Sequence, residues 1–184
     1  MSGKSKKVDI LSKRGQNRGQ INLSFGMIFS IIMIIVFIAF AFYAIGKFLN
    51  IQKAAQGAQF IDALENNVEK MWRSEQGSQE LEYKLPNTVE IVCFADFSGG
   101  EMARPSTARE LYSELRFSYF GEENMFFYPT GSAGGIDAVK IENINLIGIT
   151  SQENPYCIQT KDGKIKLIIK KERSDGLVTV MRTG

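Results

Sequence analysis

An unbroken apolar run near the N-terminus dominates the hydropathy pattern of the chain. Residues 25–45 are almost wholly Phe, Ile, Met, Val and Ala, and no charged residue occurs between Arg18 and Lys47. About 20 apolar residues in a helix, at ~1.5 Å per residue, span the ~30 Å hydrocarbon core of a bilayer. A helix also lets a single segment satisfy its own backbone hydrogen bonds there. The pattern predicts one transmembrane helix over residues 20–49.

An amphipathic stretch without proline follows the apolar run. Its apolar residues recur at spacings of three and four, which define one helical face: Ile51, Ala54, Ala58, Ile61, Leu64, Val68 and Met71. The spacing predicts that the helix continues outside the membrane over residues 50–76, as one helix from about Leu23 to Ser74. A break near Gly46 or Gly57, giving two helices, is the alternative.

Part of this face is suited to contacts between helices. Ala54 and Ala58 have small side chains that permit close approach in helix bundles, and Ile61 follows them on the same face. We therefore expect Ala54, Ala58 and Ile61 to pack against other subunits.

From residue 77 onward the pattern changes to short β-rich runs separated by turns. Asp-Gly pairs at 162–163 and 175–176 predict hairpins, a short helix is expected near 107–117, and TGSAGG at 130–135 is expected to be a flexible loop. The runs are enriched in Ile, Val, Tyr and Phe, and several of them alternate apolar with polar residues, as antiparallel strands do: ELEYKL, TVEIVCFAD, NMFFY, VKIENINLIGI, KIKLIIKKE and LVTVMR. The predicted class is α+β, with a long N-terminal transmembrane helix and a small, mainly antiparallel β-sheet domain over 77–184.

The charge of the 184-residue chain is unevenly distributed. The formal net charge is +2, yet the first 20 residues contain six Lys or Arg against one Asp. The basic character therefore belongs to a leader over residues 1–19. Because basic flanks stay on the cytoplasmic side of a span, we expect a single-pass protein of the cell membrane with its C-terminal domain outside. The lipid bilayer is the expected partner; a basic tail without interleaved aromatics does not favour nucleic acid.

The residue inventory argues against an enzyme. With no His, the chain cannot form a Ser-His-Asp or Cys-His nucleophile or a His-liganded metal site. Its carboxylates are not paired with a nucleophile or a phosphate cradle, so we expect no catalytic activity, cofactor or metal. Cys93 and Cys157 both fall in the exported domain, where two thiols predict a disulfide, with two buried free thiols as the alternative.

The junction between the leader and the apolar run reads Arg18-Gly19-Gln20. This arrangement, over about residues 13–74, resembles the class III signal peptide of archaeal type IV pilin-like proteins. In that family a basic leader ends in Lys/Arg-Gly, a prepilin-peptidase-like enzyme cuts on the cytoplasmic side, and mature chains usually begin with Gln. The resemblance implies cleavage between Gly19 and Gln20; Gly15-Gln16 is a second candidate junction.

The resemblance also implies a function. It points to a subunit, major or minor, of an archaeal type IV pilus-like assembly, with the processing enzyme and other pilin-like subunits as partners. Many pilins have Glu at the fifth mature position, which helps register subunits, whereas this chain has Ser24 and so lacks that docking charge. The alternative is a bitopic, membrane-anchored binding protein or complex component that does not form a filament.

Overall fold

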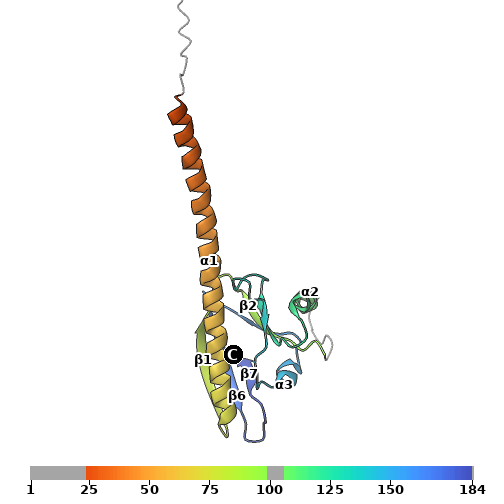
Figure 1. Cartoon of the computed structure of the whole chain (residues 1–184). Coiled ribbons are helices and arrows are strands. Elements are labelled where there is room, and N and C mark those ends of the chain that lie inside the picture. The colour runs from red at the N-terminus through yellow and green to blue at the C-terminus, as the bar shows by residue number, and fades with distance from the viewer. Residues whose placement is uncertain (1–23, 99–105, 184) are drawn as a thin grey trace, which may run out of the picture. The chain divides into compact units, whose positions relative to one another are not determined.

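The structure is a computed structural model that describes residues 24–98 and 106–183 (Figure 1). The predicted processing site at Gly19 and Gln20 lies outside the described residues. By its internal contacts the chain divides into two units, residues 1–42 and 43–184. The first unit contributes the start of a helix, and the second contains the rest of that helix together with the strands of the described residues.

Helix α1 (Phe25–Arg73) is a single α-helix that continues through Gly46 and Gly57. It begins directly after Ser24, whose carbonyl oxygen accepts a hydrogen bond from the backbone N–H of Met27 at 2.8 Å. The continuous helix, rather than the broken one, is therefore the form that the structure adopts.

In the second unit, α1 buries one stripe of side chains in the core. The buried residues recur at spacings of three and four: Gly57, Phe60, Leu64, Val68 and Met71. Leu64, Val68 and Met71 belong to the predicted face, whereas the buried Gly57 and Phe60 lie beside its earlier residues and Ile51 is exposed. The ring of Phe60 packs edge-on against Tyr83 at 5.3 Å and against Phe127 at 5.9 Å between ring centroids. These contacts hold the helix against both sheets of the domain.

The strands form two sheets in which every pair is antiparallel, as predicted. The first sheet has the order β1-β6-β7 and the second the order β4-β3-β2-β5. Their bounds are β1 Gly77–Lys84, β2 Ile91–Phe94, β3 Met125–Tyr128, β4 Ala138–Val139, β5 Tyr156–Gln159, β6 Lys164–Lys171 and β7 Thr179–Arg182. A long helix followed by small antiparallel sheets is an α+β arrangement consistent with a pilin-like fold.

The second sheet carries an apolar cluster on each of its faces. Val92 and Phe127 point into the main core with α1, whereas Cys93 and Phe126 point into a smaller cluster. Helix α2 (Ser106–Leu115) and the 3-10 turn η1 (Arg116–Ser118) belong to that second face, where Leu115 is buried. The short helix expected near 107–117 is thus present.

One predicted strand is different in the structure. The run VKIENINLIGI, residues 139–149, contains only the second residue of strand β4 and then turns into helix α3 (Leu146–Thr150). Strand β4 ends at Val139, and Asn143 takes a left-handed conformation (φ 62°) in the turn that precedes α3. The side chain of Asn145 then accepts a hydrogen bond from the N–H of Gly148 and caps the helix. Two asparagines therefore outweigh the β-branched residues around them.

Candidate functional site

The apolar part of α1 is a surface without a partner inside the described chain. All side chains from Phe25 to Leu49 are exposed, including Phe25 at 84% and Phe42 at 73%. The hydroxyl of Ser30 donates to the carbonyl oxygen of Gly26 at 2.8 Å, so this polar group is satisfied within the helix. Among the described residues, α1 is the one helix long and apolar enough to cross a membrane.

The chemistry of the helix surface changes between Tyr43 and Lys47. Lys47 is the first charged residue after the apolar run, and its Nζ lies 5.9 Å from the centroid of the Tyr43 ring. Tyr is enriched where membrane meets water, and Lys can extend its ammonium group from an apolar stem to the headgroups. This pair has the chemistry expected at the boundary of a membrane span.

The three residues predicted to contact other subunits, Ala54, Ala58 and Ile61, are all half-buried. Ile61 packs against the main core of its own domain, and the backbone of Ala54 is covered by a loop of that domain. Their role in contacts between subunits stays a prediction. Part of the face, however, is already occupied by intramolecular packing.

The loop that covers Ala54 is the Gly-rich stretch between β3 and β4, residues 129–137. Gly134 has a φ of +72°, and a Cβ placed on it would lie 2.3 Å from the Ala54 nitrogen and 2.6 Å from the Asn50 carbonyl oxygen. A Cβ placed on Gly57 would lie 3.3 Å from that of Ala133. Loop and helix therefore meet through backbone atoms and small side chains, and the stretch expected to be flexible buries Ser132 and Ala133.

Three loops meet at the end of the domain that contains residues 129–137. The hydroxyl of Thr88, between β1 and β2, donates to the carbonyl oxygen of Ser132 at 2.6 Å. The N–H of Leu85 donates to the carbonyl oxygen of Gly163, in the turn between β5 and β6, at 2.8 Å. A turn is present at Asp162-Gly163, with both residues at positive φ, but it joins β5 and β6, which belong to different sheets, so it does not close the predicted hairpin. No sequence pattern predicts this contact between loops directly, although small residues occur in both the loop of residues 129–137 and the facing part of α1.

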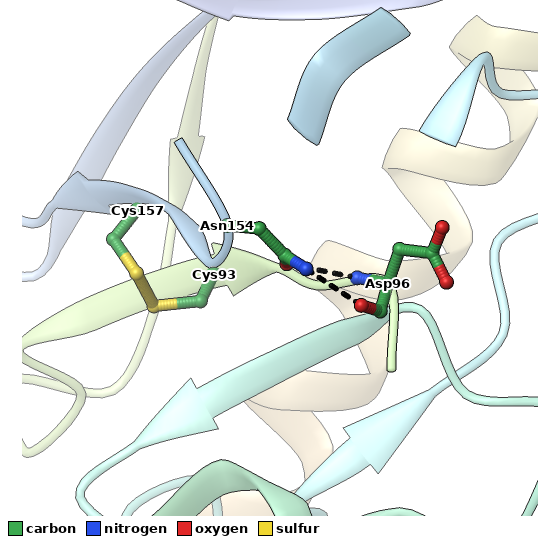
Figure 2. Close-up of a disulfide and its surroundings, with 4 residues drawn as sticks. All are labelled: Cys93, Asp96, Asn154 and Cys157. Carbon is green, nitrogen blue, oxygen red and sulfur yellow. Dashed lines mark hydrogen bonds between the residues drawn. A yellow bond between two sulfur atoms is a disulfide. The ribbon is translucent and has the colours of Figure 1, made fainter. Parts of the chain in front are cut away.

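The predicted disulfide between Cys93 and Cys157 is present. The two residues are register partners on the adjacent strands β2 and β5, and Figure 2 shows the bond crossing between those strands. Just beyond it, the side-chain amide of Asn154 donates to the Asp96 carbonyl oxygen at 2.6 Å and accepts from the Asp96 N–H at 3.1 Å (Figure 2). A buried asparagine thus extends the pairing of the two strands after the ladder ends.

A cleft of about 1140 Å³ lies beside the disulfide, on the α2 side of the second sheet. Its apolar lining comes from strands and from α2, and includes Ile91, Leu111, Tyr128, Pro155, Cys157 and Ile158. Its charged lining includes Glu82, Glu110, Glu114, Glu153, Lys161, Asp162, Lys164, Lys166 and Arg182. The cleft therefore combines apolar area with groups of both charges.

The charges at the cleft are partly paired. The Lys164 ammonium lies 2.8 Å from a Glu82 carboxylate oxygen, and this hydrogen bond lowers the pKa of Glu82. The Glu114 carboxylate raises the pKa of the Tyr128 hydroxyl. Within residues 24–98 and 106–183, no three His, Cys, Asp or Glu side chains converge in a group that could hold a metal ion. The arrangement offers contact area and hydrogen-bonding groups rather than a preformed ion site.

Comparison with known protein families, with curated proteins and with solved structures finds no match for this chain. The class of the protein is therefore described by its fold: a long N-terminal helix with an exposed apolar part, followed by small antiparallel sheets and one disulfide.

Proposed function

We propose that this chain is a non-enzymatic, pilin-like membrane protein and a subunit, major or minor, of an archaeal type IV pilus-like assembly. The basic leader is cytoplasmic, the apolar part of α1 spans the cell membrane, and the β domain is outside. One observation carries the proposal. The exposed, charge-free run from Phe25 to Gly46 belongs to the same helix whose later turns pack onto the antiparallel sheets.

The physical basis is the hydrophobic effect on that run. Exposed apolar area is unfavourable in water at roughly 25 cal/mol per Å². Lipid covers such a surface when the subunit is in the membrane, and helices of neighbouring subunits cover it in a bundle. The same helix surface is therefore suited to both stages of a pilus-like assembly.

Processing at Gly19 is the first test. A peptidase subsite that accepts Gly needs an extended backbone without a side chain, so Gly19→Leu should block cleavage while Gly15→Leu, the matched control, should not. Intact-mass measurement of protein from membranes of its native host should find a parent chain that begins at Gln20. A mature chain that retains Met1 to Gly19, or one cleaved normally in the Gly19→Leu variant, would contradict the processing proposal.

Assembly is a separate question because Ser24 replaces the Glu that many pilins have. Ser24 is exposed and carries no charge, so subunit register would depend on apolar packing of the helices. A photo-cross-linking residue at Phe37, which is 64% exposed, should give adducts between copies in native membranes. The same residue at exposed Ser174 is the control. Purely monomeric protein at both positions would argue against a bundle.

The cleft on the α2 side of the sheet favours a second candidate function. Its apolar lining and its charges of both signs, including Glu110 and Lys166, are suited to a polypeptide or polymer segment. In that case the protein is a bitopic, anchored binding protein or complex component. Cross-linking to a different protein from Glu110, without adducts between copies from Phe37, would support this alternative.

A further inference from the structure

We propose that the loop of residues 129–137 is a membrane-contact surface that lies against the lipid headgroups on the outer side of the bilayer. The inference rests on the proposed membrane span and adds to it the distance of this loop from the bilayer surface. Its partner is the bilayer surface itself, not a second protein.

The first step places the outer boundary of the hydrocarbon core. Charge-free sequence ends at Lys47, and the ammonium of Lys47 sits over the ring of Tyr43. Both side chains are exposed, and polar residues follow at Asn50 and Gln52. An interfacial aromatic next to the first Lys marks the level at which acyl chains give way to headgroups.

The second step places the loop relative to that boundary. Gly134 abuts the Asn50 carbonyl and the Ala54 backbone, which lie three and seven residues beyond Lys47. At ~1.5 Å per residue these contacts are roughly 5 and 10 Å along the helix from Lys47. The headgroup region adds about 5 to 8 Å on each side of the hydrocarbon core. The loop therefore begins inside the headgroup region or at its outer edge.

The third step concerns the chemistry that the loop presents. Thr130, Gly131 and Gly135 are exposed, small and uncharged, so they can approach headgroups without burying a charge or a large apolar side chain. The one charged residue of the loop, Asp137, accepts a hydrogen bond from the N–H of Gly131 through its carboxylate. Lys53, on the same part of α1, adds a cation near the level of lipid phosphates.

The fourth step concerns rigidity. Ser132 is 7% exposed and its carbonyl accepts the Thr88 hydroxyl, while Ala133 is fully buried against the helix. The loop is therefore tied to both the helix and the β1–β2 connection. A loop held in this way keeps the rest of the domain at a fixed height above the lipid.

The opposite end of the same unit provides a matched control. The Trp72 indole N–H donates to the Gly176 carbonyl oxygen at 3.1 Å, so the β6–β7 connection lies beside the last turn of α1. Trp72 is 25 residues beyond Lys47, or roughly 38 Å along the helix. Exposed Ser174 in that connection should remain in water at all times.

The experiment measures immersion of single spin labels on the full chain with its native disulfide formed. Thr130→Cys and Ser174→Cys are labelled separately and reconstituted in vesicles of phosphatidylcholine and phosphatidylglycerol. Alkaline carbonate washing first establishes whether the protein is anchored. Collision with lipid-soluble oxygen and with a water-soluble nickel chelate is then compared for the two labels.

We expect the Thr130 label to collide several-fold less with nickel and more with oxygen than the Ser174 label. Equal nickel accessibility of the two labels in anchored protein would overturn the membrane-contact surface and leave the span intact. A Thr130 label shielded from both reagents would mean that protein covers the loop, which also overturns the inference. Release of the protein by carbonate would overturn the span and the inference together.

Discussion

Replacing Gly134 by Ala should disrupt the packing of the loop of residues 129–137 against α1. The added methyl group would lie 2.3 Å from the Ala54 nitrogen and 2.7 Å from the Ala54 Cα, distances at which atoms overlap. The obstacle is helix backbone, which cannot rotate away as a side chain can. The loop must therefore lift from the helix or the helix must shift.

The size of the effect follows from two contributions. An Ala at φ +72° has the strain of a left-handed residue, about 1–2 kcal/mol, and overpacking of a close contact adds about 1–3 kcal/mol. Gly135 is the matched control because its φ is +98° but a Cβ there meets nothing within 4 Å. Gly135→Ala should thus show the strain alone, and the difference between the two variants should isolate the contact with α1.

The assay is denaturant unfolding of the full chain in detergent micelles, followed by the fluorescence of Trp72. Trp72 is the single tryptophan and bonds to Gly176, so it reports whether the helix end stays on the sheets. We expect Gly134→Ala to lower the free energy of unfolding by about 1–3 kcal/mol more than Gly135→Ala does. Equal free energies of unfolding for the two variants would refute the close contact between loop and helix.

Three further predictions test the core, the disulfide and a buried phenol. Leu64→Ala should lower the free energy of unfolding by about 2–5 kcal/mol because Leu64 is fully buried. Ile51→Ala, at an exposed position, should change it by less than about 0.5 kcal/mol. Equal effects of the two substitutions in denaturant titrations would contradict the packing of Leu64 in the core. Replacing both Cys93 and Cys157 by Ala should cost about 4 kcal/mol in the same titrations, since the bridge closes a separation of 64 residues, and an unchanged midpoint would count against it. Burial raises the pKa of Tyr83 above its ordinary value of 10.0, so its contribution to stability is complete below pH 10.0 and is lost as pH rises through the raised pKa. Thermal unfolding between neutral and alkaline pH should show a smaller loss for Tyr83→Phe than for the parent, and identical losses would contradict a shifted phenol.

The elements that could be predicted from the sequence are those set by local patterns. A charge-free run of membrane length, and apolar spacings of three and four that reach Met71, are sufficient to predict one long helix. Alternation in KIKLIIKKE predicts the strand that buries Ile165, Leu167 and Ile169, and the structure confirms it. Each of these features depends on residues that are neighbours along the chain, so no knowledge of distant contacts is needed.

The local pattern does not predict what packs against each face of the helix. The stripe through Ala54 and Leu64 could equally have faced other subunits or the protein's own sheets, because periodicity states which residues share a face and not what covers it. In the structure Leu64 is in the domain core and Ala54 lies under Gly134. That outcome depends on a glycine 80 positions away in the chain.

Two segments in which the structure differs from the expectation show two different causes, one local and one tertiary. In VKIENINLIGI, the cap at Asn145 and the turn at Asn143 outweigh β propensity, because a helix N-terminus there has its own hydrogen-bond partner. In the loop of residues 129–137, small residues indicate flexibility when read alone, yet they permit the closest backbone approach to α1. Flexibility or tight packing of a glycine-rich loop is decided by the surface that it meets, and the chain brings that surface into place only on folding.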